Sequence, residues 1–382
     1  MDKQPTHTRP MSAENNPQKV PPSKAEVIYL GVDVHADKHV VVRQIDAASP
    51  QPAQSFNHAA LLVWIKKQQQ LAATVMVCYE AGPFGYGLCR QLRAMGVVCH
   101  VVRPRLWDEH GQKVKTDARD ALALCQALER YARGNQRALA VVRVPGEEEE
   151  RQRSKGRQRA VLVKQRRSLE ATGRSQALYY GERMKGRWWT PRAWARWQKT
   201  LAAHLVALLT SLRTVLLVIE QQITALTLEL EASGTERSAA SGLPKGLGDL
   251  TSEILAQEVC DWSRFNNRRE VASYTGLCPA EHSSGGSRRQ GALNKHGNPA
   301  LRCALVEAVW RLLRWQPQWV RWVKIQPKWE AAAKARRKQL IAALARQLAV
   351  DLWRLATGRT TLENLGLSAS SPPVAKNSTP LA

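Results

Sequence analysis

The sequence lacks the features that define several protein classes. Its 7 cysteines include no Cys-x-x-Cys pair, which argues against a structural zinc site. Residues 1–25 are polar and rich in proline, and they lack the apolar core of a signal peptide. The longest apolar stretch, 201–230, is interrupted by residues such as Arg213 and Glu220, so we expect no membrane span. A reducing cytoplasm is the expected location.

Acidic residues are also scarce. The chain has 32 Asp and Glu against 57 Lys and Arg, which gives a formal net charge of +25 at pH 7. So large an excess of positive charge predicts a polyanionic partner. Arginine and tryptophan are interleaved along 183–197, which includes Arg187 and Trp188, and this mixture is typical of nucleic-acid surfaces. The alternative is a solvated basic helix whose tryptophans anchor it in a core.

Four of the few carboxylates occupy informative positions. Asp33 lies inside one apolar run, and Glu80 ends a second. Asp117 and Asp120 are three residues apart at the start of a predicted helix. Carboxylates at the ends of buried strands are costly unless a positive charge compensates them, and the expected compensator is a hard divalent cation. By contrast, we interpret His35 as a hairpin residue rather than a ligand.

Hydrophobic periodicity predicts a mixed α/β sheet domain followed by a helical region. The expected elements of the sheet domain are a hairpin of strands 27–34 and 39–45, helices 61–71, 85–95 and 117–131, strands 75–80 and 97–102, and a possible last strand 138–144.

Within 201–230, apolar residues recur in alternating steps of four and three over more than three heptads. This spacing predicts a coiled coil. We expect it to pair two copies of the chain, and the alternative is a long helix packed within its own domain. The seam residues are Leu205, Leu209, Leu212, Leu216, Ile219, Ile223, Leu226 and Leu230.

A glycine-rich region follows the seam. The turn 243–251 opens a predicted helix and can offer backbone N–H groups to a phosphate. The serines at 283–284 precede two glycines in a loop that also contains Arg288, Arg289 and Lys295. Spacing alone favours an ordinary polar loop over a nucleophilic serine.

Two groups of residues resemble one known family. Asp33, Glu80 and the string Thr-Asp-Ala-Arg-Asp-Ala at 116–121 resemble the Asp-Glu-Asp-Asp set of a RuvC-like, RNase H-like domain. A second group of residues resembles another conserved region of the same family. It consists of Gly276-Leu-x-Pro279, Ser284-Gly285, and Lys295-x-Gly-Asn298 followed by Leu301-Arg302. This is the DEDD transposase family of insertion sequences, also called bridge-RNA-guided serine recombinases. The resemblance covers about residues 27–315.

The resemblance implies a fold, a site and partners. Asp33, Glu80, Asp117 and Asp120 would bind Mg²⁺, and Ser284 would form a covalent link to DNA, although Ser283 lies beside it. The implied partners are double-stranded DNA at the element ends and target, a structured non-coding (bridge) RNA as guide, and a homodimer that assembles into a tetramer. The candidate nucleic-acid contacts are Arg288, Arg289, Lys295, Arg302, Arg187 and Trp188.

The implied fold is α/β plus all-α. The expected regions are a disordered tail (1–25), an RNase H-like (RuvC-like) mixed-sheet domain (26–146), a basic helical and coiled-coil segment (147–235), a mainly helical transposase domain with the serine loop (236–330), a basic C-terminal helix (331–365) and a disordered tail (366–382).

Two other functions fit parts of the sequence. One is a metal-dependent, structure-selective nuclease of the junction-resolvase kind, which uses water as the nucleophile. The other is a basic nucleic-acid-binding protein with a degenerate acidic site. The string from Ser284 to Asn298 argues against the first, and the intact set of four carboxylates argues against the second.

Overall fold

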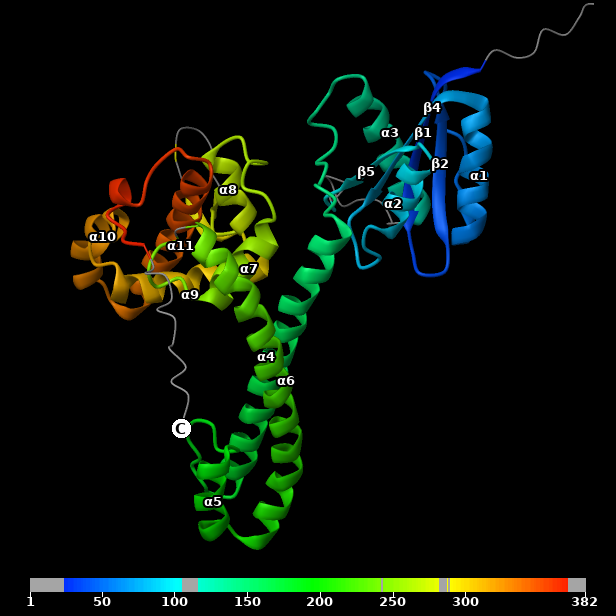
Figure 1. Cartoon of the computed structure of the whole chain (residues 1–382). Coiled ribbons are helices and arrows are strands. Elements are labelled where there is room, and N and C mark those ends of the chain that lie inside the picture. Colours follow the sequence, from blue (N-terminus) through cyan, green and yellow to red (C-terminus); the bar gives the residue numbers. More distant parts are fainter. Residues whose placement is uncertain (1–23, 105–115, 242, 282–286, 288, 370–382) are drawn as a thin grey trace, which may run out of the picture. The chain divides into compact units, whose positions relative to one another are not determined.

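The computed structural model of the chain (Figure 1) describes residues 24–104, 116–241, 243–281, 287 and 289–369. The chain divides into two compact units, Met1–Val144 and Pro145–Ala382. The boundary lies close to the expected end of the sheet domain at residue 146, whereas the helical segment and the C-terminal region form one unit.

The first unit is built on a five-stranded mixed sheet in the order β3-β2-β1-β4-β5. β1 (Ala25–Val34) and β2 (His39–Ile45) form the predicted antiparallel hairpin. β1 pairs in parallel with β4 (Ala72–Glu80), which in turn pairs in parallel with β5 (Val98–Val102). The short edge strand β3 (Gln54–Phe56) was not predicted, because its three residues are too few to show a periodicity.

The last strand predicted at 138–144 is wrong. Among the described residues it makes one isolated antiparallel bridge, between Val141 and Val102. Two backbone hydrogen bonds accompany the bridge, from Val142 N–H to the Val101 carbonyl and from Arg103 N–H to the Ala140 carbonyl. The segment therefore crosses the end of β5 and does not extend the sheet.

Alternating side chains of β1 serve two cores on opposite faces of the sheet. Ile28, Leu30 and Val32 pack in one core with residues of α1 (His58–Leu71) and α2 (Gly87–Ala94). Tyr29 packs on the other face with residues of α3, which spans Asp117–Ala132. The period of two along a strand explains this division.

Gly31 permits an unusually close approach between β1 and α3. A Cβ at this position would lie 2.2 Å from the carbonyl oxygen of Ala121 and 2.3 Å from the nitrogen of Cys125. The Cys125 thiol donates a hydrogen bond to the Tyr29 carbonyl at 3.4 Å. This contact sets α3 directly on the backbone of β1.

The second unit begins with two long antiparallel helices, α4 (Glu147–Tyr179) and α6 (Ala203–Ser241), which run side by side in Figure 1. Residues further along α4 contact residues earlier in α6, as expected for antiparallel helices. The contacts are Lys155 Nζ to Glu229 Oε2 at 2.9 Å, Arg159 Nε to Thr227 Oγ1 at 2.7 Å, and Arg166 Nη1 to Glu220 Oε2 at 2.6 Å.

The leucine seam of α6 is covered largely by its own chain, as the alternative interpretation held. Leu209, Leu216, Ile223 and Leu230, seven residues apart, are buried. A neighbouring stripe of apolar side chains remains exposed and is formed by Leu208, Val215 and Val218. Pairing of two copies stays a prediction, and it would have to use this exposed stripe.

By length and composition alone, α6 is apolar enough to cross a membrane, since an 18-residue window within Ala203–Thr235 has a mean hydropathy of 1.7. Two of its charged side chains have polar partners within the second unit. Arg213 Nε donates to the Trp189 carbonyl at 3.0 Å, and Glu220 accepts from Arg166. These contacts fit a helix packed against protein better than one inserted in lipid.

The expected tryptophan surface at 183–197 is wrong. Trp188, Trp189 and Trp194 are buried in a core between α4, α6 and the short helix α5 (Pro191–Thr200). The indole N–H of Trp188 donates to the Glu170 carbonyl at 3.1 Å. The alternative of tryptophan anchors in a core is therefore correct.

The rest of the second unit is a helical bundle with a small hairpin. Its elements are α7 (Asp249–Val259), α8 (Arg268–Thr275), β6 (Pro279–Glu281), β7 (Gln290–Leu293), α9 (Pro299–Trp315), α10 (Val320–Glu330), α11 (Lys334–Ala356) and a 3₁₀ turn (Glu363–Leu365). The expected basic C-terminal helix is α11, and one of its faces is buried in the bundle core through Leu344, Leu348 and Leu352.

The expected C-terminal tail is ordered over 366–369. Lys245 N–H donates to the Ser368 carbonyl at 2.8 Å, and the Gln316 side chain donates to the same carbonyl at 2.9 Å. Ala369 forms an isolated bridge with Pro244. The remainder of both expected tails lies outside the described residues.

Candidate active site

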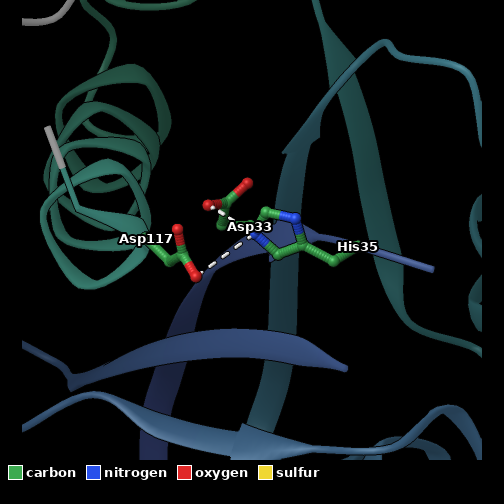
Figure 2. Close-up of side chains that lie close together, drawn as sticks. All are labelled: Asp33, His35 and Asp117. Carbon is green, nitrogen blue, oxygen red and sulfur yellow. Dashed lines mark hydrogen bonds and ion pairs between the residues drawn. The ribbon is translucent and has the colours of Figure 1, made fainter. Parts of the chain in front are cut away.

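Three side chains converge at the end of β1. Figure 2 shows the imidazole of His35 facing the carboxylates of both Asp33 and Asp117. His35 Nε2 lies 3.1 Å from Asp33 Oδ2 and 3.5 Å from Asp117 Oδ2, and Lys38 Nζ lies 4.0 Å from Asp117 Oδ2. One potential ligand atom from each of Asp33, His35 and Asp117 lies within 4.8 Å of the other two.

The N-terminal turn of α3 supplies two of the predicted carboxylates. The Thr116 side chain caps the helix by accepting the N–H of Arg119, and Asp117 and Asp120 lie in the first turn. Negative charges are favoured there because the helix dipole places partial positive charge at the N-terminus. The close packing of α3 on Gly31 brings this turn to the carboxyl end of β1.

Glu80 occupies the matching position on the next strand. Val32 of β1 pairs with Tyr79 of β4, so Asp33 and Glu80 take the following positions on parallel neighbours about 4.8 Å apart. Both continue the face that carries Tyr29 and Cys78, which is the face covered by α3. The sheet therefore brings Asp33 and Glu80 to one end, on the side where α3 begins.

Burial raises the pKa of Asp33 above its ordinary value. The neighbouring His35 opposes this rise, both by its charge and by its hydrogen bond, while the negative charges of Asp120 and Asp117 add to it. The ionised site therefore holds more negative charge than its surroundings stabilise. Carboxylate oxygens gathered in this way fit a hard divalent cation such as Mg²⁺.

Sequence reasoning missed the role of His35. The residue does lie in the hairpin turn, where its N–H donates to the Lys38 carbonyl at 3.2 Å. Its side chain also bridges Asp33 and Asp117. The spacing Asp-x-His at a strand end was the available signal, but only the position of α3 brings Asp117 to the same imidazole.

The predicted nucleophile has no described geometry. Ser283, Ser284 and Arg288 lie outside the described residues. The strands on either side, β6 and β7, pair antiparallel through Glu281 and Gln290, so the structure holds the two ends of the serine loop together. Arg289, within the loop, is exposed.

Comparison with known proteins now identifies the family. Residues 244–323 match the transposase domain of the IS116/IS110/IS902 family. The transposase y4rJ of Sinorhizobium fredii is 30% identical over 316 residues, which cover 75% of this chain and 78% of the relative. The chain belongs to the IS116/IS110/IS902 family of transposases.

Further relatives carry the same enzyme name. The transposase y4qE of Sinorhizobium fredii is 34% identical over 244 residues, or 62% of this chain and 58% of the relative. A transposase for insertion sequence element IS1533, from Leptospira borgpetersenii, is 30% identical over 112 residues, or 28% of this chain and 32% of the relative. This insertion-sequence transposase is therefore an enzyme that acts on DNA.

Within the matched region, Asn298 has a structural role in the transposase. Its side-chain oxygen caps α9 by accepting the N–H groups of Ala300 and Leu301 at 3.0 and 3.1 Å. Its amide donates to Glu258 Oε2 at 2.7 Å, and the buried Glu258 also pairs with Arg157 at 3.2 Å. Asn298 thus joins the start of α9 to the end of α7.

Gly297 and Arg302 also serve the packing of this region. A Cβ on Gly297 would lie 2.1 Å from the nitrogen of Gly276, so the two glycines meet backbone to backbone. Arg302 Nη1 donates to the Thr275 carbonyl at 3.2 Å and reaches the Lys295 carbonyl at 3.5 Å. Part of the Arg302 guanidinium is therefore engaged with the protein's own carbonyl groups, and its contact with nucleic acid stays a prediction.

The other candidate nucleic-acid contacts differ in availability. Trp188 is fully buried and offers no face to a base, which corrects that expectation. Arg187 Nη1 pairs with Glu220 Oε1 at 3.1 Å, so part of its guanidinium is occupied. Lys295 is exposed, and its backbone has a positive φ of 55° in the turn before α9. Lys295 and Arg289 are therefore still available to bind phosphate.

Proposed function

We propose that this insertion-sequence transposase cuts and rejoins DNA strands through a covalent serine–DNA intermediate, assisted by Mg²⁺ at the acidic site. The observation that carries the proposal is the gathering of Asp33, Glu80, Asp117 and Asp120 around the carboxyl ends of β1 and β4. The strand order and the mixed pairing of the sheet support a RuvC-like, RNase H-like domain.

The acidic site has the ligands that Mg²⁺ requires. Asp33, Glu80, Asp117 and Asp120 would hold the ion through carboxylate oxygens, which Mg²⁺ prefers. When bound, Mg²⁺ would offset the negative charge that develops on a phosphodiester during transfer. The raised pKa of Asp33, which is caused first by burial and then by the charges of Asp120 and Asp117, supports this assignment, since a bound cation would stabilise the ionised carboxylate.

Ser284 would supply the nucleophile. Its hydroxyl oxygen attacks the DNA phosphorus, the bond from phosphorus to the leaving strand's oxygen breaks, and the serine proton passes through solvent to that oxygen. The phosphoserine link conserves the phosphodiester bond energy. The hydroxyl of another strand can then attack the same phosphorus, restore the serine and complete the exchange.

A structured guide RNA would select the DNA. The net charge of +25 supports a polyanionic partner beyond the substrate duplex. Exposed basic residues of α4, such as Lys164 and Arg167, could contact RNA phosphates, while base pairing chooses the sequence. The complex would act in the cytoplasm, on the element ends and the target.

Two copies would pair, and pairs would assemble into a tetramer. The exposed apolar stripe of α6 supports the pairing, because such side chains gain free energy when a partner removes them from water. In that assembly the acidic site of one copy can serve the serine of another. The active site would then be complete only in the oligomer.

A denaturing gel tests the serine step. The transposase is incubated with element-end DNA, guide RNA and Mg²⁺, and the gel is examined for a protein–DNA adduct. We expect an adduct with the wild type and with the matched control Ser283→Ala, and no adduct with Ser284→Ala. Normal cutting by Ser284→Ala, without an adduct, would instead establish the nuclease that uses water.

A further inference from the structure

A hollow in the second unit is lined mainly by arginine. It lies between α8, α10 and α11, with Cys278 just before β6 at its border, and has a volume of about 520 Å³. That size falls in the range of roughly 300–1,000 Å³ that ligand pockets occupy, so it can take a stretch of backbone and not only one ion. The arginines that line this arginine hollow are Arg268, Arg269, Arg321, Arg346 and Arg354.

One of the five arginines is neutralised. Arg321 Nη2 lies 2.9 Å from Oδ1 of the fully buried Asp351, and its Nε lies 3.1 Å from Oδ2. Trp319 Nε1 donates to the same carboxylate at 3.2 Å. Asp351 is thus committed to Arg321 and to the bundle core, and its charge is not available to the other four.

Among the described residues, no side chain pairs with the guanidinium groups of the other four arginines. Arg268, Arg269, Arg346 and Arg354 make no side-chain hydrogen bond, ion pair or ring contact within the part of the chain that the structure describes. They come from helices that are far apart in sequence and reach one hollow. Like charges that converge in a hollow with protein walls focus positive potential and attract anions.

The choice of arginine indicates the kind of anion. Guanidinium groups bind phosphate in a bidentate manner, whereas lysine acts as a compact point charge. A solvated basic face is a poorer explanation, because Arg346 and Arg354 are only partly exposed and line the same hollow from positions about two turns apart on α11. The chemistry suits closely spaced phosphates on one strand.

We propose that the arginine hollow binds consecutive backbone phosphates of the DNA substrate, next to the hairpin that carries the serine loop. The inference rests on the proposed DNA-joining function and names a contact surface for its substrate. Phosphate contacts of this kind fix the register of a duplex without reading its sequence.

The salt dependence of DNA binding tests this assignment. Fluorescence anisotropy with a short labelled duplex is measured over a salt series for the full chain and for the double variant Arg346→Gln/Arg354→Gln. Each phosphate contact makes the slope of log K against log salt steeper by about 0.9. If each of the two arginines contacts one phosphate, the slope of the variant should be shallower by about 1.8. Lys334→Gln/Lys338→Gln removes the same charge from an exposed part of α11 and should change the slope less. Equal slopes for the two double variants would overturn the proposal.

Two further measurements separate the possible failures. Arg346→Lys/Arg354→Lys keeps the charge and should keep most of the slope while weakening binding. Inorganic tripolyphosphate should raise the Tm of the wild type more than that of the glutamine variant. If tripolyphosphate stabilises both the wild type and the lysine variant but the DNA slope never changes, the hollow is a site for free polyphosphate and the proposal is wrong. A wild-type chain that binds no duplex would count against the proposed function itself.

Discussion

Asp33 shows at the scale of one residue how function costs stability. Its carboxylate is partly buried, and its neighbours include two further acids as well as His35. The pKa is raised, so the folded chain penalises the ionised form. A catalytic site that is meant for a cation should show this penalty when the cation is removed.

We expect Asp33→Asn to raise the Tm of the metal-free protein at neutral pH while abolishing strand joining. The penalty on ionised Asp33 is absent below the ordinary pKa of aspartate and grows as the pH rises through the raised folded pKa. Thermal denaturation is measured with a chelator from acid to neutral pH. The difference in Tm between the variant and the wild type should increase as the pH rises. The exposed neighbour Asp37→Asn is the control. A variant less stable than the wild type at neutral pH would contradict the assignment.

Gly31 determines how close α3 lies to the strand that carries Asp33. In Gly31→Ala the new Cβ would meet the backbone of Ala121 and Cys125, which cannot move aside as a flexible side chain could. We expect a loss of about 1–3 kcal/mol in the free energy of unfolding, together with weaker Mg²⁺-dependent activity. Gly87→Ala, where a Cβ would meet nothing within 4 Å, is the matched control for urea denaturation. Equal stability of the two variants would refute the packing argument.

At the scale of elements, hydrophobic periodicity predicted those helices and strands whose formation depends mainly on local sequence. The hairpin of β1 and β2 and the helix α3 were expected, because hydrophobic periodicity marks them. The segment 138–144 has strand-like composition, yet it finds only one bridge at the end of β5. A strand requires a partner along its length, and the sequence does not show whether that partner is available.

The functional interpretation of tryptophan and histidine residues was also limited by what local sequence can show. Interleaved Trp and Arg are compatible with a nucleic-acid surface and with a core, and only tertiary packing buries Trp188 against Gly173. The carboxylate set was predicted because its residues end recognisable elements. His35 was missed because its second partner, Asp117, is distant in sequence.

The capping of α9 supports a prediction at the same scale. Asn298→Ala removes a helix cap and also takes a hydrogen bond from the buried carboxylate of Glu258. We expect a loss of about 2 kcal/mol or more in unfolding free energy, since a lost cap costs about 1 kcal/mol and an unsatisfied buried group about 1–3 kcal/mol. Asn267→Ala at the exposed cap of α8 should cost about 1 kcal/mol under the same denaturation conditions. If Asn298→Ala cost no more than this control, the link to Glu258 would be unimportant.

For the whole molecule, the exposed stripe of α6 predicts self-association. Val215→Glu/Val218→Glu puts charge into the apolar stripe without touching the buried seam. Light scattering after gel filtration should show oligomers for the wild type and monomers for the variant, with an unchanged Tm for the monomer. Glu substitution at the exposed Thr224, which lies on the opposite side of the same helix from Val215, is the control and should preserve the oligomer. A variant that stays oligomeric would exclude this stripe as the interface.

The central claim is that the acidic site of the first unit assists the serine of the second unit in forming a bond to DNA. The most direct measurement is the yield of covalent protein–DNA adduct for the wild type, Asp117→Asn and the exposed control Asp37→Asn, each with Mg²⁺ and with a chelator. The expected result is an adduct with the wild type and Asp37→Asn in Mg²⁺ alone, and none with Asp117→Asn. An adduct formed in full by Asp117→Asn, or by the wild type in chelator, would contradict the claim.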